Sequence, residues 1–70
     1  MTRYLVLIEP TATGFSAYLP DVPGCVTTGK TPLEAETRMR EAIAFHFEGL
    51  GSDEAIPEPR TIATYVEVAA

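Results

Sequence analysis

Few side chains in this sequence have the types and spacing that catalysis or metal binding requires. The chain holds one cysteine, Cys25, and one histidine, His46, which stand 21 residues apart. This is not the clustered pattern of a zinc site, and Cys25 has no basic neighbour to activate its thiol. We therefore expect Cys25 to be a small buried hydrophobic residue and His46 to be half-buried. The alternatives are a reactive thiol and a pH-sensitive or ligand-binding histidine.

The carboxylates are also too scattered for metal-dependent phosphoryl chemistry, which needs several of them around a divalent ion. Glu9 is the only acid in the first predicted strand, and Glu67 is the only one in the last. We expect no catalytic residue, no metal and no cofactor. A degenerate nuclease stays as an alternative hypothesis, which a titration with divalent metal would test.

Length and charge indicate the kind of partner. Seventy residues make a single domain, 1–70, at a size where one core is marginal, and a single cysteine excludes an internal disulfide. A second copy or another partner is therefore expected to add burial, as a dimer or a tetramer. The net charge of −5, with five scattered bases, argues against direct nucleic-acid binding and favours a basic protein partner, although it also serves solubility.

No apolar run is long enough to span a membrane, and the first residues lack the layout of a signal peptide. We expect a soluble, cytoplasmic protein that does not bind membranes.

Three short strands are expected before the helix. Residues 3–9 are apolar on both alternating faces and so predict a central strand. Residues 15–19 alternate and form a hairpin with it through a loop at 10–14. Residues 25–28 predict a short third strand at an edge.

The other elements are organised around the corner at residues 20–34. Its Pro-Gly step predicts a tight turn. Thr31 is the expected helix N-cap, Pro32 the first helical residue, and Glu34 the side chain that reaches back to the Thr31 N–H. The structural residues of this corner are Pro20, Pro23, Gly24, Gly29, Thr31 and Glu34.

One helix and a fourth strand are expected after the corner. The helix ends at Gly49 and Gly51, and its apolar face consists of Ala35, Met39, Ala42, Ile43, Phe47 and Leu50. Residues 61–68 alternate as a fourth strand should. A right-handed crossover places that strand beside the first, which gives a β-β-β-α-β order and a four-stranded sheet of order 3-2-1-4 with the helix on one face. The other face needs a cover, and the candidate residues for contact between copies are Leu5, Leu7, Tyr18 and Tyr65.

Several motifs together resemble the HicB antitoxin family. They are the initial Tyr-Leu-Val, Gly-Phe-Ser-Ala-Tyr-Leu-Pro, Pro-Asp-Val-Pro-Gly-Cys, Gly-Lys-Thr, Thr-Pro-Leu-Glu-Ala-Glu, Glu-Ala-Ile and Ile-Pro-Glu-Pro, and they cover nearly the whole chain. The resemblance implies a partial RNase H-like fold of the α+β class. It also implies a non-catalytic module that binds and blocks HicA, a small basic RNA-cleaving toxin that has a dsRBD-like shape and depends on a histidine.

The sequence departs from complete members of that family in one respect. It ends at Ala70, where such antitoxins continue into a helix-turn-helix or ribbon-helix-helix domain that binds DNA. We therefore expect operator binding to be absent. The alternative to an antitoxin is a stand-alone HicB-like homo-oligomer with a regulatory or structural role and no cognate toxin.

The candidate residues for toxin binding come from the corner and from the polar side of the helix: Asp21, Val22, Glu41, Phe45 and Glu48. Phe45 lies roughly 90° or more from the apolar face at about 100° per residue, so we expect it to be exposed. Asp21 either meets a basic group of the toxin or caps its own turn.

Overall fold

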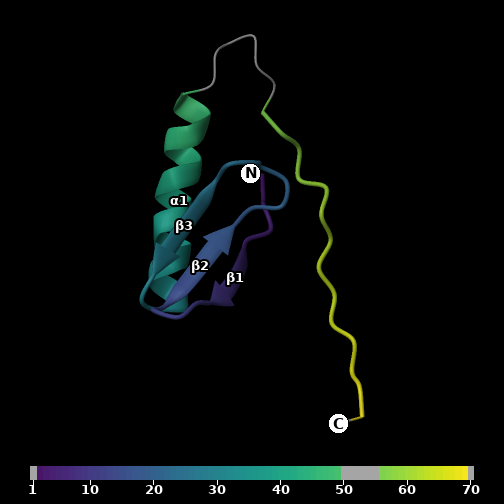
Figure 1. Ribbon diagram of the computed structural model, residues 1–70. Coiled ribbons are helices and arrows are strands. Elements are labelled where there is room, and N and C mark those ends of the chain that lie inside the picture. Colours follow the sequence, from purple (N-terminus) through teal and green to yellow (C-terminus); the bar gives the residue numbers. More distant parts are fainter. Residues whose placement is uncertain (1, 50–55, 70) are drawn as a thin grey trace.

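The structure is a computed structural model that describes residues 2–49 and 56–69. Three strands are followed by one helix, which covers one face of the sheet (Figure 1). The strands pair antiparallel in the order β1-β2-β3. The predicted α+β class, the hairpin and the edge position of the third strand are confirmed. The elements are β1 Leu7–Pro10, β2 Phe15–Tyr18, β3 Val26–Gly29 and α1 Pro32–Glu48.

The core lies between the helix and the sheet. Its buried side chains are Ala17, Leu19, Val22, Cys25, Ala35 and Met39. Tyr4, Val6 and Ile8 pack against this cluster from the N-terminal segment, so this alternating set faces the helix. The helix packs mainly over β3 and β2 and least over β1. The core is therefore covered best on the β3 side and least on the β1 side.

Two consecutive turns build the corner before β3. The N–H of Val22 donates to the Leu19 carbonyl at 3.3 Å, and the N–H of Cys25 donates to the Val22 carbonyl at 3.4 Å. Gly24 has φ 85°, the left-handed value that the third position of a type II turn requires. The predicted Pro23-Gly24 turn is confirmed, and these two turns direct the chain back over the core.

The helix begins where the sequence predicts. Thr31 is the N-cap, with φ −132° and ψ 160°, and its Oγ1 accepts from the Glu34 N–H at 3.0 Å. The expected return bond from Glu34 to the Thr31 N–H is wrong. The Glu34 carboxylate instead accepts from the Lys30 N–H at 3.3 Å, a position from which the same oxygen also pairs with Arg38 at 3.2 Å. Gly49 is the C-cap, while Leu50 and Gly51 lie outside the described residues.

The start of the helix is fixed closely on β3. A Cβ on Gly29 would lie 2.6 Å from the Ala35 nitrogen, so only glycine lets the two elements approach this far. The Thr27 hydroxyl donates to the Ala35 carbonyl at 3.0 Å, and the Arg38 guanidinium donates to the Thr28 carbonyl at the same distance. The end of β3 thus positions the first turn of α1.

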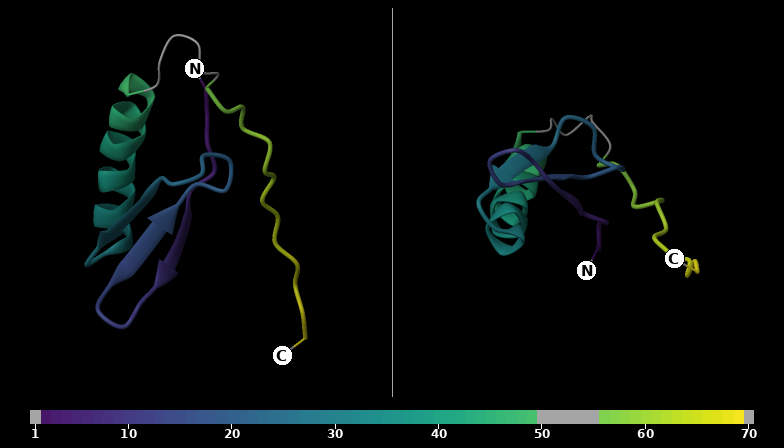
Figure 2. Two further views of the ribbon diagram at one scale, coloured as in Figure 1. Left: turned by 45° about the horizontal axis from the view of Figure 1, so that its top comes forward. Right: turned by 60° about the horizontal axis from the view of Figure 1, so that its bottom comes forward.

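The predicted fourth strand is the main difference from the structure. Residues 61–68 form no strand, and the sheet of the described residues has three strands instead of the order 3-2-1-4. β1 is also shorter than predicted and lies at an edge instead of the centre. Figures 1 and 2 show the segment after residue 56 as an extended chain that runs beside the sheet but apart from it. An alternating sequence favours a strand, but the strand forms only where another strand's backbone is hydrogen-bonded to it.

Candidate partner-binding surfaces

The second half of the helix brings together three of the predicted partner-binding residues. Glu41, Phe45 and Glu48 follow one another at steps of four and three residues, so they share one face of α1. All three are exposed, and Phe45 is 78% exposed. The predicted exposure of Phe45 is confirmed. We call these three residues and Val26 the Phe45 surface.

Val26 adds a second apolar side chain that the sequence reasoning missed. It begins β3 and is 64% exposed, because the inward position next to it belongs to Cys25. That alternation was the signal that would have found it. A shallow hollow of about 360 Å³ lies between residues 24–26 and the second half of the helix. Its lining includes Gly24, Cys25, Val26, Ala42, Phe45 and His46.

The charges on the helix are distributed unevenly. In its first half, Glu34 pairs with Arg38 at 3.2 Å and Glu36 pairs with Arg40 at 2.6 Å. Glu41 and Glu48 form no ion pair with any residue that the structure describes. An acid in the last turn of a helix opposes the helix dipole. Glu41 and Glu48 thus give the Phe45 surface a negative charge that no ion pair of the described residues offsets.

Val22 does not belong to such a surface. It is only 1% exposed, because the two turns of the corner direct its side chain into the core. Its assignment as a partner-binding residue is wrong. Val22 and Met39 are the largest fully buried side chains of the described residues. The role of Val22 is therefore in packing.

Asp21 binds the C-terminal part of its own chain. Its carboxylate accepts from the N–H groups of Arg60 and Thr61, each at 3.0 Å, and from the Thr61 hydroxyl at 2.7 Å. The backbone N–H and the hydroxyl of Thr61 hold the pKa of Asp21 below its ordinary value of 3.8. The Tyr4 hydroxyl also donates to the Pro57 carbonyl. Residues 57–61 are thereby attached to the folded body.

Cys25 and His46 have structural positions. The Cys25 thiol is buried and donates to the Met39 sulfur at 3.6 Å, and burial raises the pKa of the thiol. His46 is half-buried, as predicted, and its ring centroid lies 6.0 Å from that of Phe47. A thiol held in its neutral form is a poor nucleophile.

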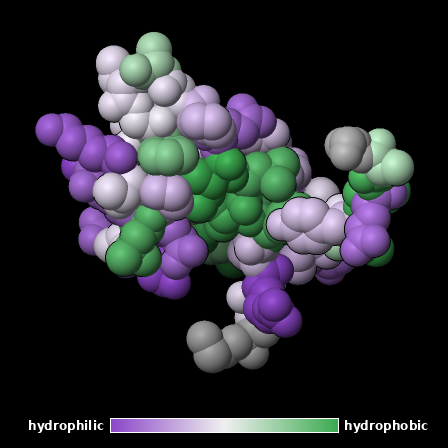
Figure 3. Space-filling view, turned by 90° about the horizontal axis from the view of Figure 1, so that it is seen from below, coloured by the Kyte–Doolittle hydropathy of each residue, from purple (hydrophilic) through white to green (hydrophobic). Residues whose placement is uncertain are grey.

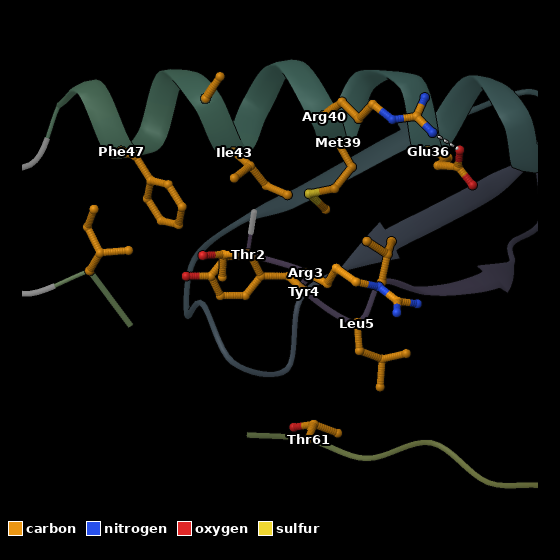
Figure 4. A pocket seen from close by; sticks show the side chains of 13 residues that line it. Thr2, Arg3, Tyr4, Leu5, Glu36, Met39, Arg40, Ile43, Phe47 and Thr61 are labelled. Atoms are coloured by element: carbon orange, nitrogen blue, oxygen red, sulfur yellow. Dashed lines mark hydrogen bonds and ion pairs between the residues drawn. The ribbon is translucent and has the colours of Figure 1, made fainter. Parts of the chain in front are cut away.

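A larger hollow, of about 1070 Å³, opens beside the N-terminal segment. Met39, Ile43 and Phe47 of the helix point into it, opposite Tyr4 (Figure 4). The rings of Tyr4 and Phe47 pack at a tilt, with centroids 5.7 Å apart. Figure 3 shows apolar side chains gathered in the middle of the face seen from below, with the C-terminal segment projecting to one side. We call the hollow that Tyr4, Met39, Ile43 and Phe47 border the open flank.

The four residues predicted for contact between copies are only partly brought together. Leu7 and Tyr18 lie opposite each other on β1 and β2 and are half-buried. Leu5 lies at the open flank and points away from the helix, toward the segment that carries Thr61 (Figure 4). Tyr65 lies on the extended segment and is 99% exposed.

No group of three or more His, Cys, Asp or Glu side chains that could hold a metal ion occurs within residues 2–49 and 56–69.

None of the helices in the described part of the chain is long and apolar enough to cross a membrane.

Comparison with protein families gives a match over residues 4–69 to the family described as the HicB-like antitoxin of bacterial toxin-antitoxin systems. The chain is 42% identical over 64 residues to an uncharacterised 14.9 kDa protein from the rep-hol intergenic region of Haemophilus phage HP1. That alignment covers 90% of this chain but 48% of the phage protein, so the chain spans about half the length of that relative.

Two further relatives are UPF0150 proteins of similar size. The one from Helicobacter pylori is 31% identical over 65 residues, which cover 90% of each chain. The one from Thermoplasma acidophilum is 39% identical over 57 residues, which cover 79% of this chain and 83% of the relative. No solved structure matches the chain.

Proposed function

The chain belongs to the HicB-like antitoxin family of bacterial toxin-antitoxin systems, and we propose that it is a non-catalytic module that binds and blocks a small, basic RNA-cleaving toxin of the HicA type. The observation that supports this most is the family match, which includes both the corner and the helix that form the Phe45 surface. Binding would take place in the cytoplasm.

The Phe45 surface has the composition of a small protein interface. Phe45 and Val26 supply exposed apolar contact area, and aromatic anchors carry much of the energy of many interfaces. Glu41 and Glu48 flank Phe45 without a basic partner on the described part of the helix. A basic toxin would be attracted to these carboxylates, which set the association rate and the orientation of docking more than the final affinity.

Inhibition would follow from steric exclusion. A toxin that cleaves RNA must hold its substrate on a basic surface, because the phosphate backbone dominates such binding. An acidic module that docks on that surface removes it from RNA without performing any chemistry. This mechanism requires no nucleophile and no metal, and it needs only a stable surface of suitable charge.

The test is RNA cleavage by a HicA-type toxin with and without an equimolar amount of this protein. We expect inhibition and co-elution of the two proteins. Phe45→Ala is expected to weaken binding by about 30-fold, which corresponds to loss of an interface anchor worth about 2 kcal/mol. Glu41→Gln together with Glu48→Gln should slow association at low salt, with less effect at high salt.

The matched control is Leu33→Ala, which removes another exposed apolar side chain from the same helix but far from the Phe45 surface. It should bind as the natural protein does. Unimpaired cleavage at every protein concentration would contradict the proposal. Equal losses in Phe45→Ala and Leu33→Ala would contradict the choice of surface.

A self-assembling protein without a cognate toxin is the second candidate function. The observation that favours it is the exposed C-terminal segment, where Ile62, Tyr65 and Val66 are 89%, 99% and 81% exposed. A protein that assembled in this way and inhibited no toxin would have a regulatory or structural role in the same family.

A further inference from the structure

The segment that follows Thr61 has the pattern of a strand but lacks the environment of one. We call residues 62–69 the arm. Ile62, Val66 and Val68 lie on one alternating face, and each is at least 78% exposed. No hydrogen bond joins the arm to another described residue. A soluble chain seldom leaves such a row of apolar side chains and unpaired backbone groups in water.

On its open flank, the folded body has an unpaired backbone and apolar side chains that no strand covers. The helix packs mainly over β3 and β2, so the half-buried Ile43 and Phe47 border a hollow of about 1070 Å³ on the β1 side, which Ile56 and Thr61 of the same chain also line. Residues 2–6, which precede β1, make no backbone hydrogen bond to another described residue. One more strand at this edge would pair with that backbone and cover the apolar side chains of the helix.

The lengths of the two parts agree. At about 3.3 Å per residue, the eight residues of the arm extend over roughly 26 Å. Residues 2–10, which are the edge strand β1 and the five residues before it, would extend over a similar distance of roughly 30 Å by the same measure. The arm can therefore pair along almost the whole edge.

The arm is held apart from the edge of its own body. The bonds from Asp21 to Arg60 and Thr61, and the bond from Tyr4 to Pro57, fix the residues that precede it. From that attachment the arm runs beside the sheet with a gap between them in both views of Figure 2. Thus the same chain offers a strand and an edge that are not joined to each other.

We propose that the protein is a dimer in which each copy inserts its arm at the open flank of the other. The arm takes the fourth-strand position beside residues 2–10 of the second copy. Ile62, Val66 and Val68 face its helix and fill the hollow, while Tyr65 lies on the opposite face with Leu5. The exchange is symmetric, since each copy gives and receives the same segment, and the contact closes at two copies.

The accessible surface area of the chain is consistent with a second copy bound at the open flank. The accessible surface is 5790 Å², whereas a compact monomer of 7.6 kDa exposes about 4300 Å². The radius of gyration is 13.9 Å, against about 11 Å for a compact domain of this length. Two copies together expose roughly 3000 Å² in excess, which is within the range that obligate dimers bury.

Cross-linking between two distinguishable chains tests the exchange. Leu5→Cys and Tyr65→Cys are made in separate chains, only one of which carries an affinity tag, and a short bis-maleimide is added to the mixture. We expect a cross-linked heterodimer. The variant with both substitutions in one chain should also give dimers. A double variant that cross-links only within itself, together with no heterodimer in the mixture, would overturn the proposal. The natural chain is the control, because its Cys25 is buried.

A second measurement separates a failed exchange from a failed fold. Val66→Asp changes a side chain that is exposed in the single chain, so the body should still fold. In the dimer it would place a charge in an apolar hollow, and we expect the dimer to dissociate at least about 100-fold more readily in sedimentation. Glu67→Gln, on the opposite face of the arm, is the control and should leave the dimer intact. Equal dimerisation of both variants would contradict the proposed arrangement.

This inference does not depend on toxin binding. The Phe45 surface and the open flank involve different residues, so each can fail without the other. A monomer that still inhibits a toxin would contradict the exchange alone, and a dimer without inhibition would contradict the antitoxin function alone.

Discussion

The body and the arm carry similar alternating sequences and have opposite environments. In β2, Ala17 is fully buried, and the strand pairs with β1 on one side and β3 on the other. In the arm, Val66 is 81% exposed and the backbone forms no hydrogen bond to another described residue. The difference is the presence of a paired edge rather than the residue pattern. Alternation therefore identifies a segment that can be a strand, but it does not identify the chain that supplies its partner.

The largest predicted effect is a loss of stability in the folded body. Met39 is fully buried under the sheet, so Met39→Ala should lower the free energy of unfolding by about 2–5 kcal/mol through lost burial and the remaining cavity. Urea denaturation followed by circular dichroism measures it. Leu33→Ala, on the exposed side of the same helix, should change the value by less than about 0.5 kcal/mol. Similar losses in both variants would show that Met39 is not in a packed core.

A smaller effect is expected where the helix meets β3. Gly29→Ala adds a Cβ that would lie 2.6 Å from the Ala35 nitrogen, which should cost about 1–3 kcal/mol through overpacking. Gly49→Ala is the matched control, because its added Cβ meets nothing nearer than 3.5 Å and its φ of −78° suits alanine. Thermal unfolding of the two variants distinguishes them. A neutral Gly29→Ala would mean that the close approach is not needed for folding.

The smallest effect concerns the attachment between body and arm. The pKa of Asp21 is lowered in the folded chain. The stability that its carboxylate gives to the attachment is therefore complete above the ordinary pKa of 3.8, and it is lost as the pH falls through the lowered pKa. The amide signals of Arg60 and Thr61 should shift in that acid range by nuclear magnetic resonance. In Asp21→Asn the shift should disappear while the body stays folded. An identical titration in Asp21→Asn would show that another group causes it.

Sequence reasoning succeeded where the determining contacts are local. The N-cap at Thr31, the Pro23-Gly24 turn and the exposure of Phe45 each depend on residues a few positions apart, and each is confirmed. These features could be predicted because capping, turn chemistry and helical spacing act over a single turn of chain.

The predictions fail where contacts between residues far apart in the sequence determine the structure. Asp21 binds residues about forty positions away, at a distance in sequence that no short pattern encodes. Val22 was assigned to the surface, but two successive turns direct it into the core. The fourth strand was predicted from alternation alone, although a strand also requires pairing, and the arm does not pair with the edge strand β1 of its own sheet.

Hydrogen exchange of the arm amides at two protein concentrations tests the central claim most directly. We predict that residues 62–69 are protected where the protein is dimeric and lose protection on dilution, whereas β2 stays protected at both concentrations because its partners belong to the same chain. Arm amides that exchange freely at every concentration, or that stay protected in the monomer, would contradict the account.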